Sequence, residues 1–466
     1  MAVWTEIATS QLEYGRVDAQ FYQPQFLERK RILEKAGYKL RRLGRLTEKI
    51  DVGYVGPMTA EYCEKGIILL RSQNIKEFQI DVDRNPIFIP EAFHQKLCKS
   101  EVYPGDILIT RSGVAGNVAI VPQNFPAANS ADIIIVRLKS GIAPLSVLAF
   151  LNSAFGRFQV ERQVSGGIQG HLNLKIAEDI LVPEFPDQQQ VEIVEVVQDG
   201  ISKTAKAKAL YSSAHQILEK ELGLSKIDLS RQVGYETRLS DVSHAWRWDS
   251  EFYKPKYQRI VEGVLKGKKI RVDGFVPVGR LVSYLTNGHT PLHHDLSTGE
   301  VPFLTAEHVS DFRVDFGTDK RILQRHHETE LARTALRDGD ILITIKGKVG
   351  NCAVVQNCPQ AANINQDVAL IRLQKGIHSY FFAAWFNSLM GKQLVEQRST
   401  GGINPFLGLG NLRGMPFPVL DSKEHRRIGN LIQETVEKAY AAEQQASDLL
   451  EQAKRQVEKL IEQEAS

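Results

Sequence analysis

The hexapeptide Gly-Asp-Ile-Leu-Ile-Thr occupies residues 105–110 and returns unchanged at residues 339–344. Both copies continue into a loop with two glycines and an asparagine, Gly113-x-x-Gly116-Asn117 and Gly347-x-x-Gly350-Asn351. Further matches follow in the same order, at an offset of roughly 231 to 235 positions, which indicates a tandem duplication over nearly the whole chain. The other matched segments are Arg16-x-Asp18-x-x-Phe21-Tyr22-x-Pro24 with Arg247-x-Asp249-x-x-Phe252-Tyr253-x-Pro255, 43–46 with 278–281, 127–129 with 361–363, 152–153 with 387–388 and 166–168 with 401–403.

The composition is that of an ordinary globular protein. Of 466 residues, 42% are apolar and 24% are charged, and the net charge is +3. The chain has no run of about 18 or more apolar residues, and its first residues lack a basic region followed by an apolar stretch, so neither a membrane span nor a secretory signal is expected. We expect a cytoplasmic protein with no membrane partner. The four cysteines form no C-x-x-C pair and are interpreted as reduced thiols.

Each copy begins with a mixed α/β part. Helices are expected after the two repeated prolines, and a further helix is expected in each copy before the Gly-Gly segment. Runs of β-branched residues bounded by Gly, Pro, Asn and Asp predict strands. The predicted strands are 107–110, 118–121, 133–138 and 368–373, and the later helices are 145–158 and 379–394.

Each copy closes with a long helix. Residues 187–190 and 421–424 each place an aspartate at a candidate N-cap with Gln or Glu three positions later, as in a capping box. The first helix is expected over 187–222, where Gly200 weakens it by roughly 1 kcal/mol relative to Ala. The second has residues at alternating spacings of three and four, as in a coiled-coil seam. This seam comprises Ile432, Thr435, Ala439, Ala442, Ala446, Leu449, Ala453, Gln456 and Leu460.

Two such helices bury their apolar seams most economically against each other, and an antiparallel pair relates two equal halves by a pseudo-two-fold axis. The alternative is that each helix folds back on its own globular part. The sequence predicts an α+β fold with two tandem mixed α/β domains joined by two long helices in an antiparallel coiled coil. The expected domains are 1–186, a central helical region at 187–235, 236–420 and a C-terminal helix at 421–466.

The repeated glycine loop is the first candidate for binding. Cations and amide or hydroxyl donors of this loop can contact phosphates and base edges of a nucleic acid. A plain hairpin turn is the simpler interpretation of the glycines. The candidate DNA-binding residues are Arg111, Ser112 and Asn117 in the first copy and Lys346, Lys348 and Asn351 in the second.

The Gly-Gly loop is the second candidate. Gln169 and Asn404 occupy equivalent positions, and His171 follows in the first copy. Glutamine or asparagine can form two hydrogen bonds with adenine. Basic clusters at 29–31 with 39–42, and at 266–271, also lie at corresponding places, although such clusters are usually solvated surfaces.

Motifs for catalysis are absent. The chain has neither G-x-x-x-x-G-K-[ST] nor G-x-G-x-x-G after a strand. Asn85-Pro86-Ile87-Phe88 lacks the second proline of the adenine methyltransferase tetrapeptide and is interpreted as a turn. The pairs His293-His294 and His326-His327 are interpreted as loop residues, and Cys352 and Cys358 as small apolar residues. We therefore predict no catalytic residue, no metal site and no cofactor on this chain.

The two copies differ in defined stretches. Residues 51–65 diverge from 283–299, and residues 90–102 diverge from 324–337, whereas the strands and glycine loops match. One scaffold would then present two different surfaces. This pattern is expected of a protein that reads two unlike half-sites.

These features resemble the specificity subunit of Type I restriction–modification systems, over almost the entire chain. The resemblance rests on the duplicated G-D-I-L-I-T and G-x-x-G-N segments, on S-G-G-I-Q-G-H-L-N-L-K at 165–175, and on V-P-x-x-P-D-Q-Q-Q at 182–190 before a long helix. The second copy departs from the pattern at Leu407–Arg413, so its recognition loop is expected to differ in shape.

The resemblance implies a non-catalytic, sequence-specific DNA-binding subunit with two target-recognition domains, which reads a bipartite asymmetric target in double-stranded DNA. It implies two methyltransferase subunits as partners, which modify adenine N6 with S-adenosylmethionine, and two restriction subunits where a nuclease is present. S-adenosylmethionine, Mg and ATP are expected only on those partners. The paired helices would act as a spacer between half-sites about one helical turn, ~34 Å, apart.

Three alternatives remain open at the level of the sequence. The chain could be the DNA-recognition subunit of another modification or phage-defence assembly. It could be a duplicated enzyme with an unrecognised site, or a helix-mediated scaffold that binds no nucleic acid. Methylation of a discontinuous motif, activity of the chain alone, or absence of DNA binding would distinguish them.

Overall fold

The computed structural model describes the chain except residues 1–5, 8, 10–11, 13–16, 83–85, 112–114, 165–170, 231, 233, 268–269, 293–294 and 466. It contains two compact units. Unit 1 comprises Met1–Ala205 and Glu443–Ser466, and unit 2 comprises Lys206–Ala442. Each of the two long helices therefore contributes to both units. Among the described residues, no helix has the length and apolar character that a membrane span requires.

A four-stranded antiparallel sheet forms the centre of unit 1, in the order β2-β9-β6-β7. Its strands are β2 (Thr47–Val52), β9 (Ile133–Leu138), β6 (Ile107–Thr110) and β7 (Val118–Ile120). The predicted strands at 107–110 and 133–138 are confirmed. Ile107, Leu108 and Ile109 are fully buried because both faces of β6 are covered, which explains the unbroken apolar run.

Unit 2 repeats this sheet in the order β12-β20-β17-β18. Its strands are β12 (Val282–Asn287), β20 (Val368–Leu373), β17 (Ile341–Thr344) and β18 (Cys352–Val354). The register is the same in both units, because β6 pairs with β7 and β9 as β17 pairs with β18 and β20. The duplication in the sequence is therefore a duplication of architecture.

The first two residues of the repeated hexapeptide make the turn into the central strand. Gly105 has a φ of +88°, in the left-handed region that favours glycine. Asp106 is buried, and its carboxylate oxygens accept two hydrogen bonds of 2.8 Å from the guanidinium of Arg137 on β9. Asp340 pairs with Arg372 in the same way, at 2.7 and 3.0 Å. The motif thus serves the scaffold, because a buried carboxylate needs a charged partner.

Smaller sheets complete each unit. In unit 1 the second sheet has the order β4-β3-β8-β5, and β1 pairs with β10. In unit 2 the corresponding sheets have the orders β16-β13-β19 and β11-β21, with the extra pair β14-β15. The strands of unit 1 are β1 (Lys39–Arg42), β3 (Ile67–Leu70), β4 (Phe88–Ile89), β5 (Glu101–Val102), β8 (Ala128–Ser130) and β10 (Leu181–Glu184); those of unit 2 are β11 (Ile270–Pro277), β13 (Val301–Leu304), β14 (Val309–Ser310), β15 (Arg313–Val314), β16 (Arg321–Ile322), β19 (Asn363–Ile364) and β21 (Pro416–Leu420).

Helices flank these sheets. The helices after the repeated prolines are confirmed as α1 (Pro24–Lys35) and α9 (Pro255–Leu265). Proline fits the first turn because the amide it lacks would have no partner there. The other short helices are α2 (Leu43–Leu46), α3 (Glu91–His94), α6 (Leu174–Asp179), α8 (Leu239–Ala245), α10 (Gln324–Glu328) and α13 (Leu409–Arg413).

One predicted helix per copy is in fact two. Unit 1 has α4 (Pro144–Asn152) and α5 (Ala154–Val164), where a single helix over 145–158 was expected. The chain turns at Ser153, whose hydroxyl donates to the carbonyl of Phe150 over 2.7 Å. A Cβ on Gly156 would lie 2.2 Å from that carbonyl oxygen, so only glycine allows the close crossing.

Unit 2 has the same corner between α11 (Ser379–Asn387) and α12 (Leu389–Arg398). Ser388 caps α12 by accepting the N–H of Gly391 at 3.1 Å. The preceding Asn387 bonds both backbone groups of Cys352 on β18, at 2.8 and 2.7 Å. The repeated Asn-Ser pair therefore ties a helix to the sheet and then breaks that helix.

The two long helices are α7 (Asp187–Leu222) and α14 (Ser422–Ala465), as the sequence predicts. Asp421 caps α14, since its carboxylate accepts the N–H of Lys423 at 2.9 Å. Asp187 is instead already helical. Gln190 at that end donates its side-chain amide to the carbonyl of Phe185 over 2.7 Å, so the predicted capping box forms only in part.

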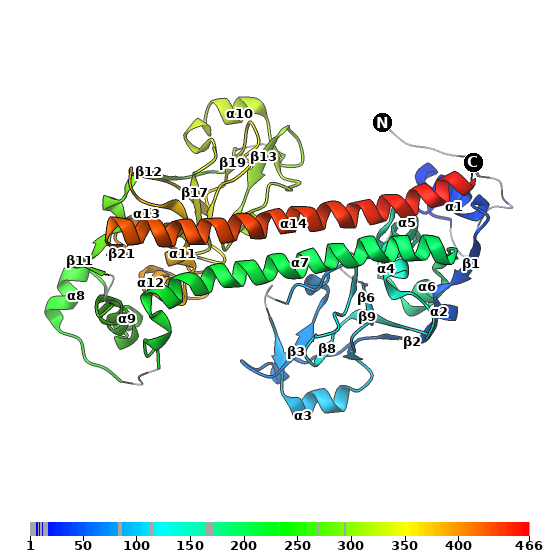
Figure 1. Cartoon of the computed structure of the whole chain (residues 1–466), viewed down its shortest axis with the longest axis horizontal. Helices are drawn as coiled ribbons and strands as arrows, with labels where there is room; N and C mark the ends of the chain where they lie inside the picture. Colours follow the sequence, from blue (N-terminus) through cyan, green and yellow to red (C-terminus); the bar gives the residue numbers. More distant parts are fainter. Residues whose placement is uncertain are drawn as a thin grey trace. The chain divides into compact units, whose positions relative to one another are not determined.

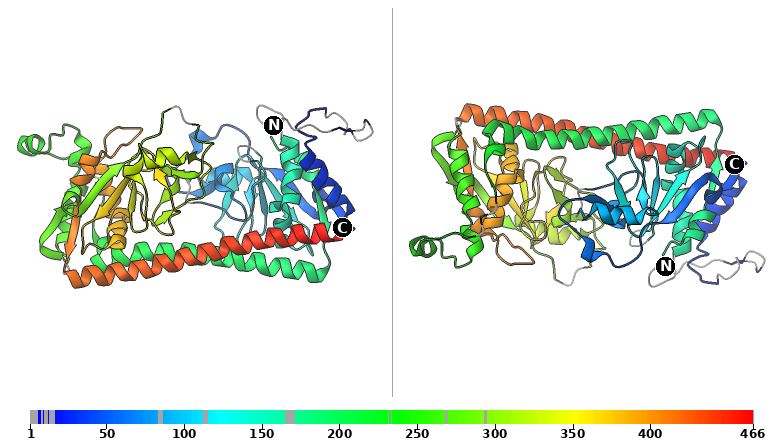
Figure 2. Two further views of the ribbon diagram at one scale, coloured as in Figure 1. Left: turned by 90° about the horizontal axis from the view of Figure 1, so that it is seen from above. Right: turned by 90° about the horizontal axis from the view of Figure 1, so that it is seen from below.

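Within each unit the two helices run side by side in opposite directions (Figure 1). In unit 1, the side chain of Lys203 bonds that of Gln445 at 3.0 Å, and Gln456 bonds Glu192 at 3.5 Å. Residue numbers therefore rise along one helix where they fall along the other. In unit 2, Arg427 bonds Glu221 at 2.7 Å. Both helices share a core with the rest of their unit, and Figure 2 shows the pairing from two further sides. The antiparallel pairing is confirmed.

The buried stripe of α14 differs from the predicted seam at four positions. Ile432, Ala439, Ala442, Ala446 and Ala453 are buried as expected. At each of the other four positions, the residue that follows in the sequence is buried instead. Val436, Leu450, Val457 and Ile461 are buried in place of Thr435, Leu449, Gln456 and Leu460. A strict alternation of three and four has a period of 3.5, whereas an α-helix has 3.6 residues per turn, so the stripe drifts away from the heptad positions.

Candidate nucleic-acid interface

In each unit the glycine loop is bonded to the residue that directly follows the Gly-Gly loop. In unit 1 the N–H of Leu172 donates to the carbonyl of Arg111 over 3.0 Å. In unit 2 the N–H of Leu407 donates to the carbonyl of Ile345 over 2.9 Å. Both leucines are fully buried. An equivalent bond thus joins the beginning of the glycine loop to the residue after the Gly-Gly loop in both units, although the two are far apart in the sequence.

The glycine loop of unit 1 connects β6 and β7. Gly116 has a φ of +90°, and its N–H donates to the carbonyl of Thr110 over 3.0 Å. Arg111 is partly buried and lies 3.4 Å from the carboxylate of Asp132. Its charge is therefore partly balanced within the unit. Ser112 lies outside the described residues.

The glycine loop of unit 2 exposes more positive charge. Lys346 and Lys348 are both exposed, and among the described residues no carboxylate lies within ion-pair distance of either. Gly350 has a φ of +97°, and a Cβ there would lie 3.1 Å from Val395 on α12. The loop therefore presses its backbone on α12 and leaves its lysines in solvent.

The asparagine side chains of the two glycine loops form hydrogen bonds within their own units. The side-chain amide of Asn117 donates to the carbonyl of Ile75 over 3.3 Å, and that of Asn351 donates to the carbonyl of Val309 over 3.2 Å. The N–H of Asn351 also donates to the hydroxyl of Thr344 over 3.0 Å. These amide N–H groups are used inside each unit, so a DNA contact by either asparagine remains a prediction that would rely on the amide oxygen or a rearrangement.

The Gly-Gly loop is described in full only in unit 2. Gln169 lies outside the described residues, and His171 is exposed. In unit 2 residues 400–406 form a small hairpin that carries Asn404, which is exposed. An isolated bridge between Lys346 and Phe406 joins this hairpin to the glycine loop. The structure thus brings Lys346 and Asn404 into neighbouring loops.

A contact that the sequence analysis did not identify anchors this region. Arg162 at the end of α5 donates to the carbonyl of Phe21 over 3.0 Å, and Gln397 on α12 donates to the carbonyl of Phe252 over 2.9 Å. The repeated Phe-Tyr segment is therefore the fixed support on which the end of each helix rests, just before the Gly-Gly loop. The signal in the sequence was the repetition of that segment.

The segment Leu407–Arg413 contains a short helix, as its counterpart in unit 1 does, although the two sequences differ. Its residues 409–413 form α13, and the counterpart forms α6. In unit 1 the cap is Asn173, whose side chain accepts the N–H of Ile176 at 2.9 Å, whereas unit 2 has Gly408 without a side-chain cap. Burial of Leu412 on α13, at 0% exposure, holds the short helix without that cap. Both copies thus have a short helix at this place, while a difference in the preceding loop stays a prediction because residues 165–170 lie outside the described residues.

The divergent stretches 90–102 and 324–337 each contain a histidine that contacts an asparagine of the matched segment. Asn129 lies 3.3 Å from the ring of His94, and Asn363 lies 2.6 Å from the ring of His327. His326 pairs instead with Glu330. His326 and His327 both lie in α10, so their interpretation as loop residues is wrong, and within the unit they have different partners. His293-His294 and Asn85 lie outside the described residues.

The basic cluster of unit 1 is paired with acids. Arg31 pairs with Glu28 at 2.6 Å, and Arg42 with Asp179 at 3.0 Å. Lys39 pairs with Glu184 at 3.5 Å. These side chains are largely exposed, and the arrangement is that of a solvated surface. The matching cluster in unit 2 falls partly outside the described residues.

Two of the four cysteines, Cys352 and Cys358, have thiols with a raised pKa. All four are free. Cys352 is buried against α11, and burial raises the pKa of its thiol. Burial also raises the pKa of Cys358 to about 11. Both therefore stay protonated and unreactive near neutral pH.

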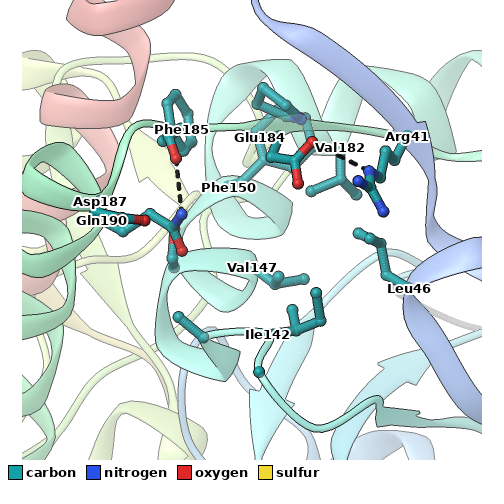
Figure 3. A pocket seen from close by; sticks show the side chains of 14 residues that line it. Arg41, Leu46, Ile142, Val147, Phe150, Val182, Glu184, Phe185, Asp187 and Gln190 are labelled. Carbon is teal, nitrogen blue, oxygen red and sulfur yellow. Dashed lines mark hydrogen bonds and ion pairs between the residues drawn. The ribbon is translucent and has the colours of Figure 1, made fainter.

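A cavity of about 190 Å³ lies in unit 1 at the start of α7. Figure 3 shows its polar side chains turned toward partners within the wall: Arg41 toward Glu184, at 3.1 Å, and Gln190 toward the carbonyl of Phe185. Gly141, just beyond the end of β9, lines the cavity. The glycine loop begins after Thr110, which pairs with Ile133 at the beginning of β9. The cavity thus lies at the other end of β9 from the described part of the glycine loop, and Arg41, Glu184 and Gln190 in its wall already have hydrogen-bond partners.

Comparison with known proteins gives structural neighbours only. No protein-family model and no curated protein matches the sequence. The Type I restriction–modification system S subunit from M. genitalium is 12% identical, with a TM-score of 0.43, over 92% of this chain and 96% of that chain. The HsdS subunit from Thermoanaerobacter tengcongensis is 14% identical, with a TM-score of 0.29, over 91% of this chain and 97% of that chain. At such identities and TM-scores, a function for this chain has to rest on its own residues.

Proposed function

We propose that this chain is the specificity subunit of a Type I restriction–modification complex, a non-catalytic protein that reads a bipartite, asymmetric target in double-stranded DNA. Each unit would bind one half-site through its glycine loop and its Gly-Gly loop. The two expected target-recognition domains, 1–186 and 236–420, supply these loops, and the regions 187–235 and 421–466 supply the spacer helices.

One observation supports the proposal: in both units an equivalent bond joins the glycine loop to the residue that follows the Gly-Gly loop, while the residues of these loops differ between the units. Unit 1 carries Arg111 and His171 in these segments, whereas unit 2 carries Lys346, Lys348 and Asn404. Cations and amides of this kind contact phosphates and base edges. A repeated scaffold with unlike side chains is suited to two unlike half-sites.

The chemistry would belong to partner subunits. Two methyltransferase subunits would bind S-adenosylmethionine and modify adenine, and restriction subunits, where present, would use Mg and ATP. The chain itself would work without a cofactor, in the cytoplasm, where its DNA target is found. Joining two weak readers makes the second contact intramolecular, so neither unit alone needs high affinity.

The decisive experiment is methylome sequencing of cells that co-express the chain with the methyltransferase encoded beside it. We expect methylated adenines in one discontinuous motif with two constant halves. A matched variant exchanges residues 144–152 of unit 1 for 379–387 of unit 2, which form equivalent helices, and should leave the motif unchanged.

Other results would select another function. Methylation of a continuous motif would favour the recognition subunit of a different modification assembly. DNA cleavage or modification by the purified chain alone would make it an enzyme. A complex that neither methylates nor retains DNA would make it a scaffold, and would contradict the proposal.

A further inference from the structure

Residues 400–406 of unit 2 form a tight hairpin with a defined base. The N–H of Thr400 donates to the carbonyl of Phe406 over 2.9 Å, and the N–H of Phe406 donates back over 2.8 Å. Gly401 has a φ of +85°, and a Cβ there would lie 2.7 Å from the carbonyl oxygen of Asn404. The turn is therefore too tight for a side chain at this position.

The base of the hairpin is fastened to the body of the unit. Leu407, directly after the hairpin, is fully buried and bonds the carbonyl of Ile345 at 2.9 Å. Phe406 also bridges to Lys346 in the glycine loop. Two attachments to the glycine loop, at Ile345 and at Lys346, hold the base of the hairpin, so that its tip projects from a fixed point.

The tip carries an apolar residue. Ile403 is 98% exposed, more than any other large hydrophobic residue described for this chain. Tight turns usually hold Gly, Asn, Asp, Pro or Ser, so an exposed isoleucine is unusual at this place. The side chain adds nothing to the core of the unit. The side chain is therefore available for a contact outside the unit.

The surroundings of Ile403 are positively charged. Lys346 and Lys348 stand exposed on the neighbouring glycine loop, and the hairpin sequence 400–406 contains no acid. An apolar tip beside cations suits a duplex nucleic acid, whose phosphates attract lysines and whose stacked bases offer an apolar gap. Asn404, next to the tip, can bond a base edge.

We propose that Ile403 inserts between neighbouring base pairs of the half-site read by unit 2, while Lys346 and Lys348 hold the flanking phosphates. This inference rests on the proposed DNA-binding function and adds a deformation of the target to it. Partial unstacking makes recognition depend on how easily a base step opens, so unit 2 reads the flexibility of its half-site as well as its base edges.

The test uses the complex with its methyltransferase partner and the target found by methylome sequencing. The adenine analogue 2-aminopurine, whose fluorescence rises on unstacking, is placed in turn at positions of the half-site of unit 2 other than the methylated adenine, which the methyltransferase itself unstacks, and affinity is measured by fluorescence anisotropy. Ile403→Ala should abolish the rise and weaken binding to the target about tenfold, with little effect on unrelated DNA. Ile403→Leu, which keeps an apolar wedge, should retain both.

The control is Leu239→Ala, which removes an apolar residue of 69% exposure from α8 in the same unit and should change neither readout. Specific binding without any rise in fluorescence, or an Ile403→Ala complex that behaves as the wild type, overturns the inference and leaves the proposed function intact. A variant that loses its methyltransferase partner, seen by size-exclusion chromatography, also overturns it, because Ile403 would then contact protein. Absence of any sequence-specific binding by the wild type overturns both proposals.

Discussion

Lys346 and Lys348 illustrate how a single residue can be assigned a role by its surroundings. Both project from the glycine loop of unit 2 into solvent, whereas Arg111 in the loop of unit 1 lies beside Asp132. A charge that is balanced within its own unit gains less from a phosphate than one that is not. We therefore expect the lysines to contribute more to DNA binding than Arg111.

Replacing both lysines by alanine should weaken binding to every DNA sequence alike. The slope of log K against log salt concentration should fall by about 1 for each phosphate contact that is lost, and is measured by anisotropy of the complex at several salt concentrations. Lys375→Ala is the control, since Lys375 is exposed beyond the other end of β20. An unchanged slope in the double variant would show that these lysines touch no phosphate.

His425 makes the stability of unit 2 depend on pH. It is buried in the first turn of α14, and its Nε2 accepts the N–H of His378 at 3.0 Å. Burial, and secondly His378, lowers the pKa of His425 to about 4. The unfolded chain takes up this proton near pH 6.5, before the folded chain does, so the free energy of unfolding falls as the pH is lowered from about 6.5 towards 4.

We expect His425→Gln to reduce this dependence by about 1.4 kcal/mol per pH unit within that range, because glutamine does not titrate and can still accept the backbone N–H. Urea unfolding followed at several pH values measures the change. The wild type and the variant should differ in slope below pH 6 and not above pH 7. Parallel curves would mean that His425 protonates equally in both states.

At the scale of the element, α14 places two neighbouring leucines in different surroundings. Leu450 is 6% exposed and packs on Gly200 of α7, where a Cβ would lie 2.8 Å from its side chain. Leu449 is only partly buried. Gly200, expected from the sequence only to weaken its helix, therefore also permits the close approach of the two helices.

Leu450→Ala should destabilise unit 1 by about 2 to 4 kcal/mol, because it leaves a cavity between α7 and α14. Leu449→Ala, the matched change one residue earlier, should cost less than about 1 kcal/mol. Denaturant unfolding of the two variants gives the comparison. Equal losses would place both leucines in the seam and would contradict the observed stripe.

At the scale of the whole molecule, the paired helices are proposed to set the unread spacer of the target. Lys203 and Gln445 face each other, so removing residues 200–206 together with 442–448 deletes one matched heptad and about 10 Å of each helix. Methylome sequencing should then show a changed spacer between two unchanged half-sites. Removal of 200–206 alone mismatches the seams and should abolish methylation. An altered half-site in the matched variant would contradict a spacer role.

The sequence by itself determined the duplication, the bounds of α7, and the strands β6, β9 and β20. The duplication follows from comparing the two halves of the sequence. The helix and the strands follow from local patterns: an apolar run of fixed length, a helical period, a proline or an aspartate at a helix end. Their physical causes act within a few residues along the chain, so no knowledge of distant contacts was needed.

Only the tertiary structure decided the corners at Ser153 and Ser388, the stripe through Leu450 and the use of Asn117 and Asn351 as internal braces. It also decided that the glycine loop bonds to the residue after the Gly-Gly loop, which is Leu172 in one unit and Leu407 in the other. Each of these depends on a partner far away in the sequence, such as the strand that accepts an amide or the helix that excludes a Cβ. A local pattern supplies the donor or the glycine, and only packing determines what it meets.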